Sequence, residues 1–396
     1  MAESGWQWLL PELLEEIAGR LVTEADHVHM HQVCAHWRAS TALPSATRRP
    51  WLVAAIRPWR RTSPVGAYSV WHLDGVGRVD LQGASPPAGV PRCCGMPRGW
   101  LALTDDDELP TRLVLWDPTS GAEIELPPLR SVLQVFLSGD PLSSPAAAEQ
   151  QQWMALASQQ IVPRANLQKT YFWRPGDASW SLMTPPNPDY CTSRIESVAF
   201  HDGKLIFVDW QQLLVVYDLN IIGAGTTPPA PAFFREVHLR HQAQRLCRCE
   251  RPHTAQAVHA VECNGDLLLV VLWQIIGHPF FAEVYKPPAA EWTAERRQRW
   301  LLEFGERVTD LGGYSLFLGR GDGFAVHAQD FPLIRGNCVY YARHDHLCKT
   351  HWVEIFDLES DVLQRIPCPP QYHMEEGISS CWPYSWFCLK RPFLKE

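Results

Sequence analysis

The sequence predicts a mainly β protein: a small helical unit over residues 1–49, followed by a β-propeller of six or seven blades over residues 50–396. Three observations lead to this fold class. Leucines recur at helical spacing near the amino terminus, a strand–turn–strand phrase recurs downstream, and the composition is rich in tryptophan and proline. The 18 tryptophans and 33 prolines favour many short strands joined by turns over long helices.

The first predicted helix lies in the stretch WLLPELLEEIAGRL, residues 8–21. Its apolar residues share one helical stripe: Leu10, Leu13, Leu14, Ile17 and Leu21. Pro11 suits the first turn, where its missing N–H would have no partner within the helix. We therefore expect a helix that presents a leucine-rich face.

The stretch HVHMHQVCAHWR, residues 27–38, holds four histidines and one cysteine, so a zinc site has to be weighed. Read as one helix, it has an apolar stripe made of Met30, Val33, Cys34 and Trp37. A metal site would draw on His27, His31 and Cys34 and has three ligands at best, whereas structural zinc prefers four. The favoured reading is solvated histidines beside a packed cysteine and tryptophan.

Together the two stretches resemble the F-box, a three-helix unit with a Leu-Pro start, a leucine-rich first helix and a Val-Cys-x-x-Trp-Arg ending. The resemblance implies docking onto a Skp-type adaptor, and through it onto a cullin–RING ubiquitin ligase. It carries over as adaptor-binding positions Leu10, Pro11, Leu13, Leu14, Ile17, Leu21, Val33, Cys34, Trp37 and Arg38, with Val28 also matching the motif. His29 and His31 depart from it, since basic or polar residues are usual there, and a mostly neutral imidazole would weaken adaptor contacts.

A physical reason for a partner exists beside the resemblance. A helical unit this small cannot bury all its leucines alone, so a partner or the rest of the chain must cover some of them. The alternative is an ordinary helical cap on the following domain.

Beyond a proline-rich stretch, residues 44–64, an apolar strand ending in an aromatic residue is followed by a polar turn and usually a second strand. This phrase recurs six times, beginning at Tyr68, Arg112, Thr170, Leu213, Phe281 and Trp352. Further strand candidates lie between the phrases, which suggests four short strands per repeat. That pattern is typical of a β-propeller and not of a sandwich.

Several of these segments resemble a plant-type family of KIB-like β-propellers that commonly follow an F-box. The resemblance rests on GDLLLVVLW, FAEVYK, YSLFLGRGDGFAVHAQDFP and VEIFDLES, and it is most specific over residues 265–357. It implies a propeller that recruits a target protein, and some family members bind kinases.

Other motifs favour structural readings. His344, His346, Cys348 and His351 form the densest metal-like cluster, but they fall in a loop between two predicted strands, where an exposed loop is the default. The acidic run of residues 104–108 lacks the spacing of a calcium loop and reads as a solvated turn. GRGDGF at residues 319–324 and HDG at residues 201–203 read as hairpin turns. We expect no cofactor and no catalytic residue.

Composition limits the partners. A net charge of −8 argues against general nucleic-acid binding, and the longest apolar run, residues 267–277, is too short to span a bilayer. No start resembling a signal peptide is present. We therefore expect a cytoplasmic or nuclear protein without nucleic-acid or membrane partners.

These observations predict a non-catalytic substrate-recognition subunit of a Skp–cullin–F-box ubiquitin ligase, whose helices bind the adaptor and whose propeller holds an unidentified target. Two rival functions stay open: a propeller that binds and inhibits a partner such as a kinase without degradation, and a propeller hydrolase with a site in its channel.

Overall fold

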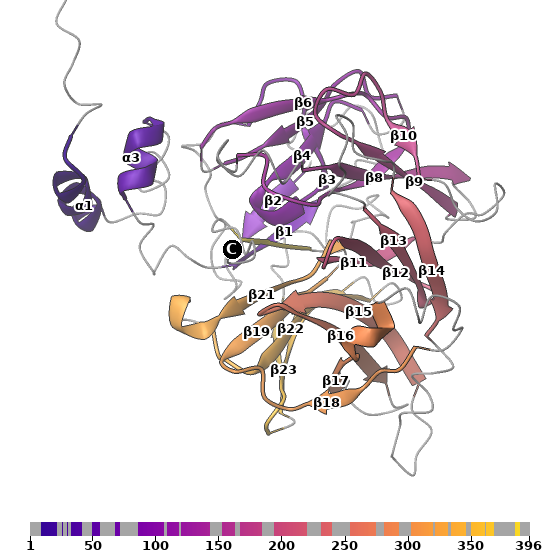
Figure 1. The fold of residues 1–396 in the computed structure, drawn as a ribbon. Coiled ribbons are helices and arrows are strands. Elements are labelled where there is room, and N and C mark those ends of the chain that lie inside the picture. The colour runs from indigo at the N-terminus through magenta and orange to yellow at the C-terminus, as the bar shows by residue number, and fades with distance from the viewer. Residues whose placement is uncertain are drawn as a thin grey trace, which may run out of the picture.

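The computed structural model shows a propeller of mostly antiparallel sheets, with two short helices among the described residues standing apart from it (Figure 1). The structure describes residues 9–21, 26, 30, 33–41, 50–55, 68–71, 86–106, 109–118, 120–142, 153–162, 167–183, 194–219, 231–239, 254–274, 281–292, 302–319, 321–331, 334–345, 350–360, 362–367 and 385–388. Within these residues, no helix is long and apolar enough to cross a membrane.

The two α-helices lie near the amino terminus and contact each other. They are α1 (Pro11–Arg20) and α3 (Ala35–Ser40). Pro11 stands in the first turn of α1, as predicted, and Arg20 near its end forms an ion pair with Glu16 one turn earlier.

The three-helix unit that the sequence predicted is wrong for the described residues. Only α1 is longer than two turns, and residues 27–38 do not form one helix. Cys34 has an extended backbone, with φ of −166°, and its sulfur accepts a hydrogen bond from the backbone N–H of Trp37. Cys34 therefore caps a new helix that starts at Ala35, which breaks the expected apolar stripe between Met30 and Trp37.

Five sheets of four or five strands form the blades. Their strands are β3 (Arg92–Gly95), β4 (Leu101–Thr104), β5 (Leu113–Trp116) and β6 (Glu123–Leu126) in the first blade, and β7 (Val132–Leu137), β8 (Ala155–Val162), β9 (Leu167–Trp173) and β10 (Ser181–Leu182) in the second. The third blade has β11 (Ile195–His201), β12 (Lys204–Asp209), β13 (Leu213–Asp218) and β14 (Ala232–His238), with β20 (Gly321–Asp322) added beside β11.

The fourth blade has β15 (Thr254–Cys263), β16 (Asp266–Gln274), β17 (Phe281–Lys286) and β18 (Glu306–Val308). The fifth has β21 (Phe324–His327), β19 (Tyr314–Leu318), β22 (Cys338–Asp345), β23 (Thr350–Asp357) and β24 (Leu363–Pro367).

A three-stranded sheet joins the two ends of the propeller. Strand β1 (Pro50–Ala55) pairs with β2 (Tyr68–Trp71) on one side and with β25 (Ser385–Cys388) on the other. This sheet lies between the fifth and first blades, because β25 contacts β19 and β1 contacts β3. The circle is thus closed by strands from opposite ends of the domain.

The prediction of six or seven blades is wrong: among the described residues, the propeller has five. Of the five phrases from Arg112 onward, those at Arg112, Thr170 and Trp352 each supply the last two strands of a blade. The phrases at Leu213 and Phe281 supply one strand each, β13 and β17. The described part of the phrase at Tyr68 forms β2, which belongs to the closing sheet. Counting that phrase as a blade produced the excess.

The hairpin turns lie where the sequence placed them. Asp202 and Gly203, both with positive φ, join β11 to β12, and Asn264 and Gly265 do the same between β15 and β16. Positive φ at both central residues suits the right-handed twist of the paired strands. GRGDGF likewise turns the chain from β19 to β21, which pair antiparallel.

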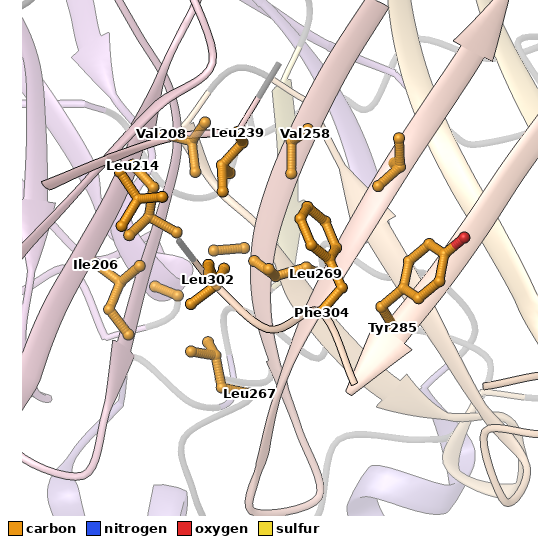
Figure 2. Close-up of a cluster of buried hydrophobic side chains, with 14 of the residues drawn as sticks. Ile206, Val208, Leu214, Leu239, Val258, Leu267, Leu269, Tyr285, Leu302 and Phe304 are labelled. Atoms are coloured by element: carbon orange, nitrogen blue, oxygen red, sulfur yellow. The ribbon is translucent and has the colours of Figure 1, made fainter. Parts of the chain in front are cut away.

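The core consists of apolar side chains packed between neighbouring blades. Figure 2 shows the cluster between the third and fourth blades, where Ile206 and Leu214 from one sheet face Leu267 and Leu269 from the next. Both faces of strand β16 are covered, and every residue from Leu267 to Trp273 is buried. Sheets covered on both faces read as continuous apolar runs, as LLLVVLW does.

Three short 3₁₀ helices complete the described structure. They are η3 (Pro97–Gly99), η4 (Ala289–Trp292) and η6 (Ala328–Asp330). The first of them bears on the centre of the propeller, because η3 contacts β7, β20 and β25.

Candidate protein-interaction site

The start of α1 leaves two leucines in solvent. Leu10 is 63% exposed and Leu13 is 45% exposed, and Pro11 between them is exposed as well. Large exposed apolar side chains that cluster are informative, whereas single ones are ordinary. Val33, which is 54% exposed, adds a third. We call Leu10, Leu13 and Val33 the N-terminal apolar surface.

The rest of the predicted stripe is turned inward. Leu14 is fully buried and packs with Ala18 and Met30 in a small core. Side chains that are partly buried against this core are Leu9, Ile17, Leu21 and Trp37. The stripe from Leu10 to Leu21 is therefore split, with its first turn open to solvent and its later turns used to hold α1 against α3.

Hydrogen bonds fix α3 beside the start of α1. The His36 ring nitrogen Nε2 lies 2.8 Å from the carbonyl oxygen of Leu9. The Thr41 hydroxyl donates to the carbonyl of Trp37 at 2.8 Å and so ties the end of α3. Because His36 is held at Leu9, Val33 three residues earlier lies at the same end of the unit as Leu10.

The ten predicted adaptor-binding residues thus fall into three groups. Leu10, Pro11, Leu13 and Val33 are exposed, whereas Leu14, Ile17, Leu21, Cys34 and Trp37 are buried or half-buried. The side chain of Arg38 lies outside the described residues. A binding role stays a prediction for all ten, and the exposed group is the part that a partner can reach without unfolding the helices.

Sequence reasoning missed a charged pair, Arg98 and Asp322, that lies where η3 and β20 meet near the centre of the propeller. Strand β20 pairs in parallel with β11, which places Asp322 opposite Val198 in the innermost strand of another blade. The Arg98 guanidinium lies 5.1 Å from the centre of the Phe200 ring. GRGDGF carried one signal of this role, an aspartate between two glycines, but the strand with which it pairs lies far away in the sequence.

Burial controls the ionisation of this central group. It raises the pKa of Asp322 to about 7, against the attraction of Arg98, and raises the pKa of Glu262 as well. Burial lowers the pKa of His259 on β15 to about 4 despite the nearby Glu196. Neither carboxylate oxygen of Asp322 has a hydrogen-bond partner among the described residues. A raised carboxyl pKa suits acid–base chemistry, but both oxygens are shielded from solvent, so this group reads as interior structure.

The candidate metal cluster is only partly described. His344 on β22 lies directly opposite His351 on β23 in the antiparallel register. His346 and Cys348 lie outside the described residues, as do His27, His29 and His31. In the part of the chain that the structure describes, no three His, Cys, Asp or Glu side chains gather as metal ligands would.

The acidic run after β4 forms a turn held by its own carboxylates. Asp105 accepts hydrogen bonds from the backbone N–H groups of Thr111 and Arg112, at 3.0 and 3.1 Å, and from the Thr111 hydroxyl. Asp106 accepts from the N–H of Leu109 at 3.1 Å. Backbone donors thus occupy these oxygens in the way of an Asx turn, which agrees with the reading as a solvated turn.

The fold and these surfaces define a β-propeller interaction domain with a separate helical segment, and the comparisons with known proteins agree. A family model, the KIB1-4 beta-propeller, matches residues 74–361, which is more than half of the chain. The chain therefore belongs to the KIB1-4 β-propeller family. No curated protein matches the sequence.

Solved structures match only distantly. The computationally designed Ika8 protein matches at 9% identity and a TM-score of 0.28, over 68% of this chain and 60% of that one. A putative TolB from Agrobacterium tumefaciens matches at 10% identity and 0.32, over 81% and 88%. The Cps50 (Swd1) β-propeller domain from Myceliophteria thermophila matches at 9% and 0.29, over 79% and 95%. At these scores the matches carry no argument about function, and this chain spans less than two thirds of Ika8.

Proposed function

We propose that this chain is the substrate-recognition subunit of a Skp–cullin–F-box ubiquitin ligase. Its N-terminal segment binds a Skp-type adaptor, and its propeller holds a target protein for ubiquitination. The mechanism is proximity: tethering raises the effective concentration of the target at the ubiquitin carrier, and the chain performs no bond chemistry itself.

One observation carries the adaptor half of this proposal. Leu10 and Leu13 stay exposed although α1 and α3 form a core with each other, and both helices stand apart from the sheets (Figure 1). An exposed pair of leucines beside a Leu-Pro start is the part of the F-box resemblance that the folded segment leaves open. Burying them against a partner removes apolar area from water, which favours association.

The test is co-purification with a Skp-type adaptor. Wild-type protein is expected to bind, and Leu10→Ala combined with Leu13→Ala is expected to weaken binding about tenfold or more, since central apolar contacts dominate interfaces. Leu182→Ala is the matched control: Leu182 is 41% exposed but lies on the outer strand of a blade, so binding should not change. Wild-type protein that never binds adaptor would remove the proposal.

A second function has support of its own. The described N-terminal residues lack the three-helix arrangement, and the chain matches the propeller family over residues 74–361 only. Both facts favour a propeller that binds a partner, such as a kinase, and inhibits it without degradation. Target binding that survives deletion of residues 1–45, in a protein that shows no adaptor binding, would select this function.

A further inference from the structure

Three consecutive blades each present one large apolar side chain at the junction of their second and third strands. Leu109 is 59% exposed between β4 and β5, Ile161 is 40% exposed at the end of β8, and Trp210 is 55% exposed between β12 and β13. We call Leu109, Ile161 and Trp210 the rim surface. The corresponding junctions of the other two blades, residues 275–280 and 346–349, lie outside the described residues.

Topology places all three residues on one face of the propeller. In a blade of antiparallel strands, the second-to-third turn lies at the same end as the link to the next blade. Hydrogen bonds agree: the N–H of Gln160 donates to the carbonyl of Ser131, and the N–H of Trp210 donates to that of Arg194, both in inter-blade links. The blades are neighbours, because mixed clusters of buried side chains join the first to the second and the second to the third.

The turn that carries Trp210 is held rigid. The Asp209 carboxylate accepts hydrogen bonds from the N–H groups of Gln211 and Leu213, at 2.9 and 2.8 Å. The Gln212 side chain donates to the carbonyl of Ala255 in the next blade at 2.8 Å. The backbone is thus anchored on both sides while the indole stays in solvent. A turn whose backbone is already ordered loses less conformational entropy on binding, and tryptophan is the residue type most enriched at binding hot spots.

The turn that carries Leu109 is built the same way but is more acidic. Its backbone is held by Asp105 and Asp106, and the sequence continues with Asp107 and Glu108 immediately before Leu109. Burial alone would raise the pKa of Asp105, but the hydrogen bonds from Thr111 and Arg112 lower it below its ordinary value. This carboxylate is therefore charged at neutral pH. The only arginine of the turn, Arg112, is engaged with Glu123 and Glu125 at 3.4 Å each.

An apolar surface beside a run of carboxylates complements a partner with apolar side chains flanked by cations. The net charge of −8 adds long-range attraction for such a partner. In such a partner, a leucine or an aromatic residue would contact the rim surface, and a neighbouring lysine or arginine would lie near the acidic turn.

We propose that the rim surface is the target-binding surface of the propeller, and that it takes a polypeptide segment with apolar side chains flanked by lysine or arginine. This inference rests on the proposed function, because the occupant is the protein that the receptor recruits. The opposite face lacks such a series among the described residues: Leu142 and Val362 are exposed there singly, at 41% and 51%, in blades that are not neighbours.

The experiment uses full-length protein and a phage-displayed library of random short peptides. Enriched peptides should combine leucine or aromatic residues with lysine or arginine, and their binding should weaken with added salt. Trp210→Ser should weaken the best synthetic peptide about tenfold or more. Asp106→Asn, which keeps an acceptor for the Leu109 N–H, should weaken it by a smaller factor and flatten the salt dependence. Val362→Ser is the matched control and should leave binding unchanged.

Three outcomes would overturn the inference. They are enriched peptides without basic residues, binding that Trp210→Ser does not affect, and a dimer of the free protein that Trp210→Ser dissolves, which would make the rim a contact between copies. Adaptor binding, measured on the same Trp210→Ser protein, should stay at the wild-type level. The experiment therefore distinguishes failure of the rim-surface inference from failure of the adaptor-binding proposal.

Discussion

The N-terminal segment and the propeller treat their apolar residues in opposite ways. In α1, Leu14 is buried, while Leu13 beside it and Leu10 one turn earlier remain in solvent. In β16, every side chain from Leu267 to Trp273 is buried. The difference follows from layering: a blade has a neighbour on each face, whereas the described contacts of α1, with α3 and Met30, bury one side of the helix. Apolar residues within the inner strands of the propeller are buried between blades, whereas those at the start of α1 remain exposed, as do the rim residues in the turns.

The largest expected effect lies inside the propeller. Arg235 and Glu291 form an ion pair at 3.2 Å with both side chains 1% exposed. Arg235→Ala leaves a buried carboxylate without its cation, so we expect a loss of about 3–5 kcal/mol in the free energy of unfolding, measured by chemical denaturation. Lys286→Ala, which removes a half-exposed pair with Asp266, should cost about 1 kcal/mol or less. Equal losses in the two variants would contradict the contrast.

The second prediction compares one leucine from each region. Leu269→Ala and Leu14→Ala each remove a fully buried side chain, at a cost of about 2–5 kcal/mol to the unit that contains it. Hydrogen exchange should show faster opening of the propeller strands in Leu269→Ala, and of α1 and α3 alone in Leu14→Ala. If Leu14→Ala also loosens the blades, the two regions are coupled and the comparison fails.

The third prediction concerns pH. Burial raises the pKa of Asp322 to about 7, above its value in the unfolded chain, so the folded protein holds this proton more tightly. The contribution of the Asp322 carboxyl to the free energy of unfolding is fully present below pH about 4 and is lost as the pH rises through about 7. Asp322→Asn should therefore remove a fall in stability between these values, measured as the difference between the two unfolding profiles. If the difference in unfolding free energy between wild type and Asp322→Asn does not vary with pH between these values, the assignment to Asp322 is contradicted. His259, whose pKa is lowered, acts with the opposite sign, and its stabilising effect is lost as the pH falls from 6.5 towards 4.

The smallest expected effect is on the exposed leucines. Leu13→Ser should change the free energy of unfolding by about 0.5 kcal/mol or less, since its side chain is 45% exposed. A large loss of helicity by circular dichroism would mean that Leu13 supports the fold, and Leu13 would then no longer count as part of the N-terminal apolar surface.

The sequence predicted a KIB-like β-propeller correctly, though not its blade number, because the strand and turn signals are local. Alternating apolar strands and turns such as HDG depend on a few neighbouring residues, and HDG does form the tight turn between β11 and β12. The first helix was also predicted correctly, with Pro11 in its first turn. Exposure within its stripe was not predictable from spacing, because which leucines face solvent depends on where α3 packs.

The errors arose where distant segments meet. The blade number depended on whether the phrase at Tyr68 formed a blade, and that was decided by β25, more than 300 residues away. The charged centre was missed for the same reason, since Asp322 and Arg98 meet only once the circle is closed. The break at Cys34 was a local feature, but a cysteine sulfur is a weak cap that spacing rules do not anticipate.

Closure of the circle through β1 and β25 has a consequence for synthesis. Residues 385–388 must leave the ribosome before β1 gains its second partner, so this pairing follows translation of all five blades. Until then the first and fifth blades each have an uncovered flank, and the nascent molecule offers chaperones a site that the finished one hides. A truncation that removes β25 would therefore reduce the yield of folded protein in the cell more than it would alter the binding surfaces of the protein that does fold.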